Sequence, residues 1–327
     1  MPHLALDSPS GSSLRRVSQY LSSESWMAYG LLIGVVAATL AVQADAASST
    51  GAGLLLGPSM PLVFAALAQM FIILVGDFDL GVGYAVGLVN VLSATILPGD
   101  ALLGWVAIAL VVLGYIAMGA IVEFLEVPAI VVTLGASFVW LGTGLIVSPT
   151  PGGSAPGWLQ SATTGVLPVV PVSIYIIVAT AVLTWWVLRR WKYGIILRAL
   201  GNSRTALKDA GRAPALARLS AYGIAGVLAV LAGLVTTGVT TSSDVNASAV
   251  LTLSTFVVVV IGGCRFTGGF VEPVGVVAAA VALSLLTSLL TFLNVNSIYD
   301  TAVEGGILVI AMSMKWSVDI VKRHVAR

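Results

Sequence analysis

The chain has 327 residues, of which 58% are hydrophobic and only 9% are charged, and its mean hydropathy is +1.04. A soluble domain carries roughly a quarter charged residues, so this composition excludes a water-soluble globular protein and indicates an integral membrane protein. The net charge of +1 gives no indication of nucleic acid or another acidic partner. The single cysteine excludes an intrachain disulfide, and the only histidines, His3 and His324, lie in the tails, so no metal site is expected.

Apolar stretches long enough to cross a bilayer recur along the chain and predict the all-α class, a polytopic bundle of about ten transmembrane helices. The membrane domain is expected at 27–314, between an amino-terminal tail, 1–26, and a carboxy-terminal tail, 315–327. The eighth stretch is short, and it is tilted, extended backwards or re-entrant. In chain order the predicted spans are 27–43, 58–76, 80–97, 102–122, 128–148, 172–188, 219–238, 250–261, 271–292 and 298–314.

The first span is followed by Ala44-Asp45-Ala46, which has the form of a signal-peptidase site. The long region before this span and its nearly full spanning length favour a retained signal anchor over a cleaved signal peptide.

Lysine and arginine are absent between Arg16 and Arg189 and then gather in one loop, 189–218. Cytoplasmic loops of membrane proteins carry an excess of these residues. With ten spans, both termini and the loop 189–218 fall on the cytoplasmic side, and every predicted external loop lacks basic residues. The basic members of this loop are Arg189, Arg190, Lys192, Arg198, Arg204, Lys208, Arg212 and Arg218.

The longest predicted external connection, 148–171, is rich in Gly, Pro and Ser and is expected to be an irregular surface loop. Two interpretations stay open for it, a surface that receives a partner and a plain linker.

Within the cytoplasmic loop, the stretch 200–214 predicts a short helix. Ser203 is expected to cap its start, Gly211 to close its end and Pro214 to prevent its resumption. A helix this short is unstable alone, so it needs a partner surface or the membrane face. The alternative is a basic loop that only sets the topology and touches anionic lipid. No G-x-x-x-x-G-K-[ST] pattern occurs, so any ATPase that drives this protein is a separate polypeptide.

The segment VGDFDLGVGY places Asp77 and Asp79 among glycines in a chain that is otherwise almost free of charge. A charge at the bilayer centre costs several kcal/mol, about 3 on insertion scales. Positions i and i+2 of a helix point about 200° apart, so the two carboxylates line one face only if the backbone is irregular. We therefore expect a helix break at Gly76, Asp77, Asp79, Gly81 and Gly83.

Two interpretations of Asp79 remain open: it caps a helix that begins at Leu80, or it lines a pore or binds a cation. The cap would explain one aspartate only, and Asp77 is then expected in cytoplasmic water beside the break.

Four segments resemble motifs of the membrane permeases of ribose-type (monosaccharide) ABC importers. GDFDLGVG, 76–83, is similar to the GGIDLSVG of that family, and VVIGGCRFTGG, 259–269, is similar to VVIGGTSLSGG. SRTALKDAG, 203–211, resembles a coupling loop usually written NPEAARLSG, and VPAIVVTLG, 127–135, is similar to IPPFIATLG. The chain departs from the family where Asp77 replaces glycine, Thr205 replaces glutamate and Glu304 replaces lysine. The second motif implies a further helix break at Gly262, Gly263, Gly268 and Gly269.

The resemblance implies a type II importer fold in a bacterial inner (plasma) membrane, with a second permease copy or paralogue beside it. It implies cytoplasmic ABC ATPase subunits, which carry ATP and Mg, and a periplasmic or extracellular sugar-binding protein. The permease itself then binds no cofactor and is not catalytic. The ATPase-coupling residues would be Ser203, Arg204, Ala206, Lys208 and Gly211.

Contact with a sugar needs neutral polar groups and aromatic faces. Candidates for the translocation pathway are Gln69, Asp79, Asn90, Thr133 and Trp140, and interhelical packing is the other interpretation of the neutral ones. The expected function is the permease of an ATP-driven monosaccharide importer. The alternative is a secondary transporter or facilitator that works alone, for which broken helices are also typical.

Overall fold

The computed structural model describes residues 25–295 and isolated positions between 299 and 313. The tail 315–327, nearly all of the tail 1–26 and much of the predicted tenth span, 298–314, lie outside the described residues.

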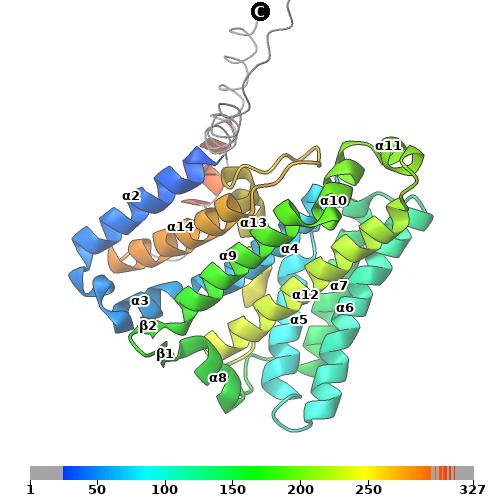
Figure 1. The fold of residues 1–327 in the computed structure, drawn as a ribbon. Helices are drawn as coiled ribbons and strands as arrows, with labels where there is room; N and C mark the ends of the chain where they lie inside the picture. Colours follow the sequence, from blue (N-terminus) through cyan, green and yellow to red (C-terminus); the bar gives the residue numbers. More distant parts are fainter. Residues whose placement is uncertain are drawn as a thin grey trace, which may run out of the picture.

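Helices make up most of the described chain (Figure 1). In order they are α2 (Trp26–Val42), η1 (Ala44–Ala47), α3 (Ser49–Leu56), α4 (Ser59–Leu74), α5 (Val82–Thr95), α6 (Ala101–Phe124), α7 (Ala129–Val147), α8 (Gly157–Thr164), α9 (Val172–Arg190), α10 (Lys192–Asn202), α11 (Arg204–Asp209), α12 (Pro214–Thr240), η2 (Ala247–Ala249), α13 (Val250–Ile261) and α14 (Pro273–Phe292), with two-residue strands β1 (Val166–Leu167) and β2 (Val170–Pro171).

The helices confirm the all-α class. Five of them, α6, α7, α9, α12 and α14, are long and apolar enough to cross a membrane, and α3 with α4, bent by 41°, makes a sixth. The helices α2 and α5 and the stretch Ala247–Ile261 are apolar but shorter. The eighth predicted span is extended backwards, because η2 leads directly into α13. The total of ten spans stays a prediction.

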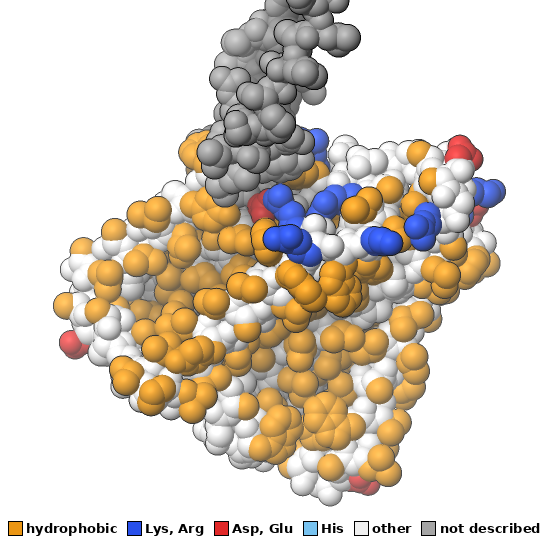
Figure 2. Space-filling model, in the orientation of Figure 1, with side chains coloured by type: hydrophobic (Ala, Val, Ile, Leu, Met, Phe, Trp, Pro, Cys, Tyr) orange, Lys and Arg blue, Asp and Glu red, His pale blue; other side chains and the backbone are white. Residues whose placement is uncertain are grey.

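Helix α4 is the centre of the bundle, since all of its residues from Ser59 to Leu74 are buried. It packs against α5, α12, α13 and α14. Helices α7 and α9 instead expose most of their surface, including Phe138, Ile146 and Leu183. Figure 2 shows hydrophobic side chains over the whole middle of the visible face. Such a surface is too apolar for water and fits the hydrocarbon of a bilayer.

The two ends of the molecule differ in charge. Every lysine and arginine among the described residues lies between Arg189 and Arg265, and on the face drawn in Figure 2 the basic side chains gather at the end that carries α10 and α11. We call this the basic end. The opposite end carries α8 and the β1–β2 hairpin (Figure 1). This separation is what the positive-inside rule requires of a cytoplasmic and an external side.

Tryptophan pairs lie towards both ends. Trp105 and Trp158 stack with ring centroids 6.2 Å apart beside α8, and Trp186 and Trp191 meet edge to face at 5.0 Å where α9 joins α10. Tryptophan is enriched at both interfaces of a membrane, so the two pairs indicate the two membrane–water interfaces, with the apolar middle of the molecule between them.

The expectation of an irregular loop at 148–171 is wrong. The segment contains α8 and the antiparallel β1–β2 pair, in which Val166 faces Pro171. It folds because α8 packs on α12: Leu159 and Thr163 are buried, and the Thr163 Oγ1 atom fills the space that a side chain at Gly238 would need. A Gly/Pro-rich composition gives no sign of such long-range packing.

Candidate functional site

The two glycine motifs meet at the basic end, together with α10. The Gly269 N–H donates to the Leu74 carbonyl at 3.0 Å, at the end of α4. A Cβ atom on Gly268 would lie 2.9 Å from both the Gly201 carbonyl oxygen and the Gly76 Cα. Only glycine permits three backbones to come so close, and Gly76 and Gly268 also have positive φ values, +89° and +83°. The expected helix breaks are therefore parts of one junction.

The other predicted glycines serve the same region. Gly263 and Gly269 also have positive φ, and Gly262 lets α13 approach α14, since a Cβ there would be 2.7 Å from the Val276 Cα. Gly81 and Gly83 have negative φ, and their role is close approach: a Cβ at Gly81 would lie 2.9 Å from the Thr133 carbonyl oxygen.

Asp79 is almost completely buried and has two partners. Its Oδ1 accepts from the Gly81 N–H at 2.7 Å, and its Oδ2 accepts from the Tyr115 hydroxyl at 2.8 Å. The predicted helix start at Leu80 is wrong, because α5 begins at Val82, after Gly81. Asp79 still binds a free amide at the start of this helix, as an aspartate before a helix N-terminus does.

The pair of hydrogen bonds on Asp79 predicts different outcomes for two substitutions. Asp79→Asn keeps an acceptor for Gly81 and an NH₂ group beside the Tyr115 hydroxyl oxygen, so we expect near-normal stability. Asp79→Ala removes both bonds and leaves a buried hydroxyl unsatisfied, which costs about 2 kcal/mol. Thermal unfolding of both variants in detergent and transport at matched expression measure this. If Asn is as damaging as Ala, the carboxylate acts through its charge and the capping interpretation fails.

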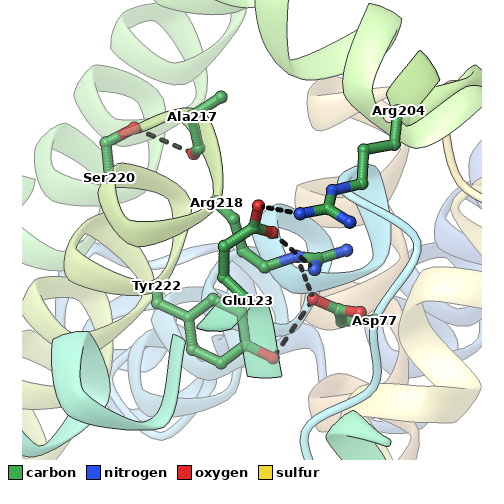
Figure 3. A network of polar contacts seen from close by, with 7 residues as sticks. All are labelled: Asp77, Glu123, Arg204, Ala217, Arg218, Ser220 and Tyr222. Atoms are coloured by element: carbon green, nitrogen blue, oxygen red, sulfur yellow. Dashed lines mark hydrogen bonds and ion pairs between the residues drawn. The ribbon is translucent and has the colours of Figure 1, made fainter. Parts of the chain in front are cut away.

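Asp77 does not lie in cytoplasmic water, as the sequence suggested. It is buried, with its Oδ2 atom 3.1 Å from Arg218 Nε and accepting from the Tyr222 hydroxyl at 3.3 Å (Figure 3). Arg218 stands in the first turns of α12, so the residue that neutralises Asp77 belongs to the basic loop. A buried carboxylate is tolerated when such a partner is present.

Each of the two aspartates accepts a hydrogen bond from a tyrosine, and the two tyrosines lie on neighbouring helices. Tyr115 of α6 packs on Gly226 of α12, and Tyr222 of α12 packs on Gly119 of α6. A Cβ atom added at Gly226 or Gly119 would lie only 2.8 or 2.9 Å from the tyrosine side chain. Each helix thus carries Tyr-x-x-x-Gly, and the reciprocal contacts make the pair antiparallel. Neither tyrosine is among the site residues predicted from the sequence, and this repeated spacing is the signal that marks them.

Three of the five pathway candidates lie near one another, around the start of α5. The Thr133 Oγ1 accepts from the Leu80 N–H at 3.1 Å, and the Trp140 ring stacks on Tyr115 at 6.4 Å, beside Asp79. The Trp140 Nε1 is buried without a hydrogen-bond partner.

The other two candidates lie elsewhere. Asn90 ties α5 to α12: its Nδ2 donates to Thr237 Oγ1 at 2.9 Å, and its Oδ1 accepts from the Asp244 N–H at 3.0 Å. Its amide is therefore used in packing. Gln69 lies in the middle of α4, and both polar atoms of its buried amide lack a hydrogen-bond partner. Among the residues that the structure describes, no three His, Cys, Asp or Glu side chains are grouped to hold a metal ion.

The predicted coupling residues lie on α11 and at its two ends. The Ser203 Oγ accepts from the Ala206 N–H at 3.2 Å and so caps the helix, and Gly211 follows its end with a φ of +71°, so both predicted boundary signals are confirmed. The side chains of Ala206 and Lys208 are exposed to the surroundings.

Two expectations about this helix are wrong. Pro214 does not prevent the chain from returning to a helix; it is the first residue of α12, where its missing N–H costs nothing. The helix also needs no foreign surface to form, because the chain supplies one. Leu207 is buried, and Arg204 Nη2 lies 2.7 Å from Glu123 Oε1 at the end of α6.

The chain is similar to several curated import permeases. It is 25% identical over 260 residues to the galactose/methyl galactoside import permease protein MglC of Haemophilus influenzae (72% of this chain, 77% of the relative). It is 26% identical over 256 residues to the ribose import permease protein RbsC of the same organism (76% and 79%), and 25% identical over 260 residues to the autoinducer 2 import system permease protein LsrC of Salmonella choleraesuis (76% and 72%).

No solved structure matches the chain at a significant level. A family profile described as "Branched-chain amino acid transport system / permease component" matches residues 51–312, which runs from within α3 past the end of α14 and therefore includes both glycine motifs, α11 and the aspartates. The chain belongs to this family of transport-system permeases.

Proposed function

We propose that this protein is the membrane subunit of an ATP-driven importer of a monosaccharide, delivered by a binding protein on the external side. The family membership supports the permease role, and the relatives that carry the names of ribose and galactose permeases support the substrate class. The permease is not itself an enzyme; ATP and Mg²⁺ belong to a separate ATPase.

The observation that carries the proposal is α11, a short helix displayed at the basic end. Its exposed Ala206 and Lys208 face outwards, while Leu207 and Arg204 anchor it from behind. A short exposed helix that carries a small side chain permits the close approach of a partner surface. We assign this role to Ser203, Arg204, Ala206, Lys208 and Gly211, with the ATPase as the partner.

The orientation of the protein in the membrane follows from the distribution of its basic residues. The basic end faces the cytoplasm of a bacterial cell, and the end with α8 and the β1–β2 hairpin faces the external binding protein. The membrane is the inner one, because an ATPase must reach α11. A second copy or a paralogue of the permease completes the assembly.

The pathway candidates of this proposal are Gln69, Thr133, Trp140 and Asp79. Gln69 offers both a donor and an acceptor that the fold leaves unused, and Trp140 offers an apolar ring face and a free N–H. A sugar needs hydroxyl partners and a surface on which its C–H face can stack. Asn90 is not proposed as a contact, because its amide already joins α5 to α12.

Two alternatives have support of their own. The named autoinducer 2 permease among the relatives makes a different small polar solute the second candidate substrate. A secondary transporter is the second candidate mechanism, since the junction at Gly76 and Gly268 is a broken-helix site of the kind such transporters use.

Uptake into proteoliposomes separates these mechanisms. Vesicles that contain the permease and its co-encoded ATPase, with the binding protein outside, are loaded with ATP or given an ion gradient without ATP. The proposal predicts uptake of a labelled monosaccharide with ATP and no uptake with the gradient alone. Uptake driven by the gradient in vesicles that lack the ATPase would support the secondary transporter instead.

A further inference from the structure

A series of alternating charges joins α11 to the break between α4 and α5. Arg204 of α11 contacts Glu123 at the end of α6, and the other oxygen of Glu123 lies 2.8 Å from Arg218 Nη1. Arg218 then contacts Asp77 in the break, 3.1 Å away. Figure 3 shows the two arginines pointing towards Glu123 from different helices, with Asp77 and Tyr222 at the inner end. We call Arg204, Glu123, Arg218 and Asp77 the charge link.

The charge link runs from the surface into the interior. The side chain of Arg204 is 52% exposed, whereas those of Arg218, Asp77 and Glu123 are 16%, 10% and 3% exposed. The two positive and two negative charges balance. In such an enclosed set each charge depends on its neighbours, because removal of one leaves its partner buried and unpaired. The buried members of the charge link, Arg218, Asp77 and Glu123, are therefore fixed in position relative to one another.

The two ends of the charge link lie in segments whose backbone is irregular, and its middle lies on long helices. Asp77 follows Gly76, which has a φ of +89°, and residues 75–81 are outside any helix. At the other end, α11 is bounded by an extended Ser203 and by Gly211 in a left-handed conformation. Changes of conformation concentrate in such connecting residues, while packed helices move as units.

From this arrangement we infer that Asp77, Glu123 and Arg218 are positioning residues that transmit a displacement of α11 to the helix break. When a cytoplasmic partner shifts α11, Arg204 moves with it, and the buried charges pass the shift to Asp77 and so to the start of α5. The inference rests on the proposed function of α11 as the docking element. The competing explanation is that the charge link only stabilises the fold.

The decisive variant is Asp77→Asn/Arg218→Gln. It removes one negative and one positive charge and keeps the Arg204–Glu123 pair, so no buried charge is left alone. Asparagine has the shape of aspartate, and glutamine keeps a polar group but is shorter than arginine. The matched control is Glu126→Gln. Glu126 also contacts Arg204, but it is 81% exposed and the distance between the charged atoms is long, 3.9 Å. Both are reconstituted with the ATPase and the binding protein, and uptake and ATP hydrolysis are measured in the same vesicles.

We expect the double variant to hydrolyse ATP at the normal rate while transport per ATP falls about tenfold, and Glu126→Gln to behave as the unmodified protein. If the charge link only stabilises the fold, the double variant should give one of two other results. Either uptake and hydrolysis fall together, in proportion to the amount of assembled complex, or both stay at the level of the unmodified protein. Either result overturns the inference.

Hydrogen exchange on the permease alone tests the charge link without the ATPase. The Asp77→Asn substitution changes the inner end of the charge link, and exchange is measured beyond its outer end, at the amides of 205–209 in α11. We expect those amides to exchange about tenfold faster, since the Arg218–Glu123–Arg204 contacts lose their inner anchor. Unchanged exchange in α11 would contradict the charge link even if the ATPase docks as proposed, so the two proposals fail separately.

Discussion

Replacing Ala206 with tryptophan is expected to release the ATPase and abolish ATP-driven uptake. Ala206 is exposed on α11, so the large side chain leaves the fold of the permease intact. At an interface that depends on close approach, the extra ring separates the two surfaces, and a loss of about 3 kcal/mol weakens binding more than a hundredfold. Co-purification of the ATPase in detergent and uptake in proteoliposomes measure the two losses.

Lys208→Ala is the matched comparison on the same helix. Lys208 is exposed as well, and an exposed ion pair contributes about 0–1 kcal/mol, so this variant should keep most of the binding and uptake. If Ala206→Trp retains the ATPase and transports normally, α11 is not the docking element and the basic loop serves only topology.

Gly201→Ala is expected to give little folded protein. A Cβ atom at this position would lie 2.0 Å from the Leu74 carbonyl oxygen and 2.4 Å from the Gly269 nitrogen. Both are backbone atoms, so α10 must move away from the end of α4 and from the second glycine motif. Forced overpacking of this kind costs about 3 kcal/mol. Expression yield and thermal unfolding in detergent are the measurements.

The control for this steric argument is Gly135→Ala in α7. Gly135 is exposed, and an added Cβ meets nothing within 4 Å. Alanine is the better helix former, so stability should stay the same or rise by about 1 kcal/mol. Equal unfolding temperatures for the two alanine variants would show that the three backbones at Gly76, Gly201 and Gly268 are not packed as described.

The helical class and the positions of most helices follow from hydropathy alone, because a chain in lipid must satisfy its backbone within each apolar segment. The boundary signals of α11 were also readable, since Ser203 and Gly211 act through their immediate neighbours. Local chemistry of this kind is visible in a sequence.

Contacts between distant residues were not readable. The partner of Asp77 is Arg218, and the partner of Arg204 is Glu123, each separated by scores of residues along the chain. Asp77 was therefore expected in water, and α11 was expected to have no support from its own chain. The start of α5 was misplaced for the same reason: Thr133 of α7 accepts the Leu80 N–H, so the helix begins at Val82 instead of Leu80.

The most direct test of the account is cross-linking from the two ends of the molecule. Cys264, the only cysteine, is first replaced by alanine, and a new cysteine is introduced by Ala206→Cys on α11 or by Gln160→Cys on α8 at the opposite end. Each variant is assembled with the ATPase and the binding protein and treated with a short cysteine-directed photo-cross-linker. The account predicts an adduct with the ATPase from position 206 and none from position 160. An ATPase adduct from position 160, or none from position 206, would contradict it.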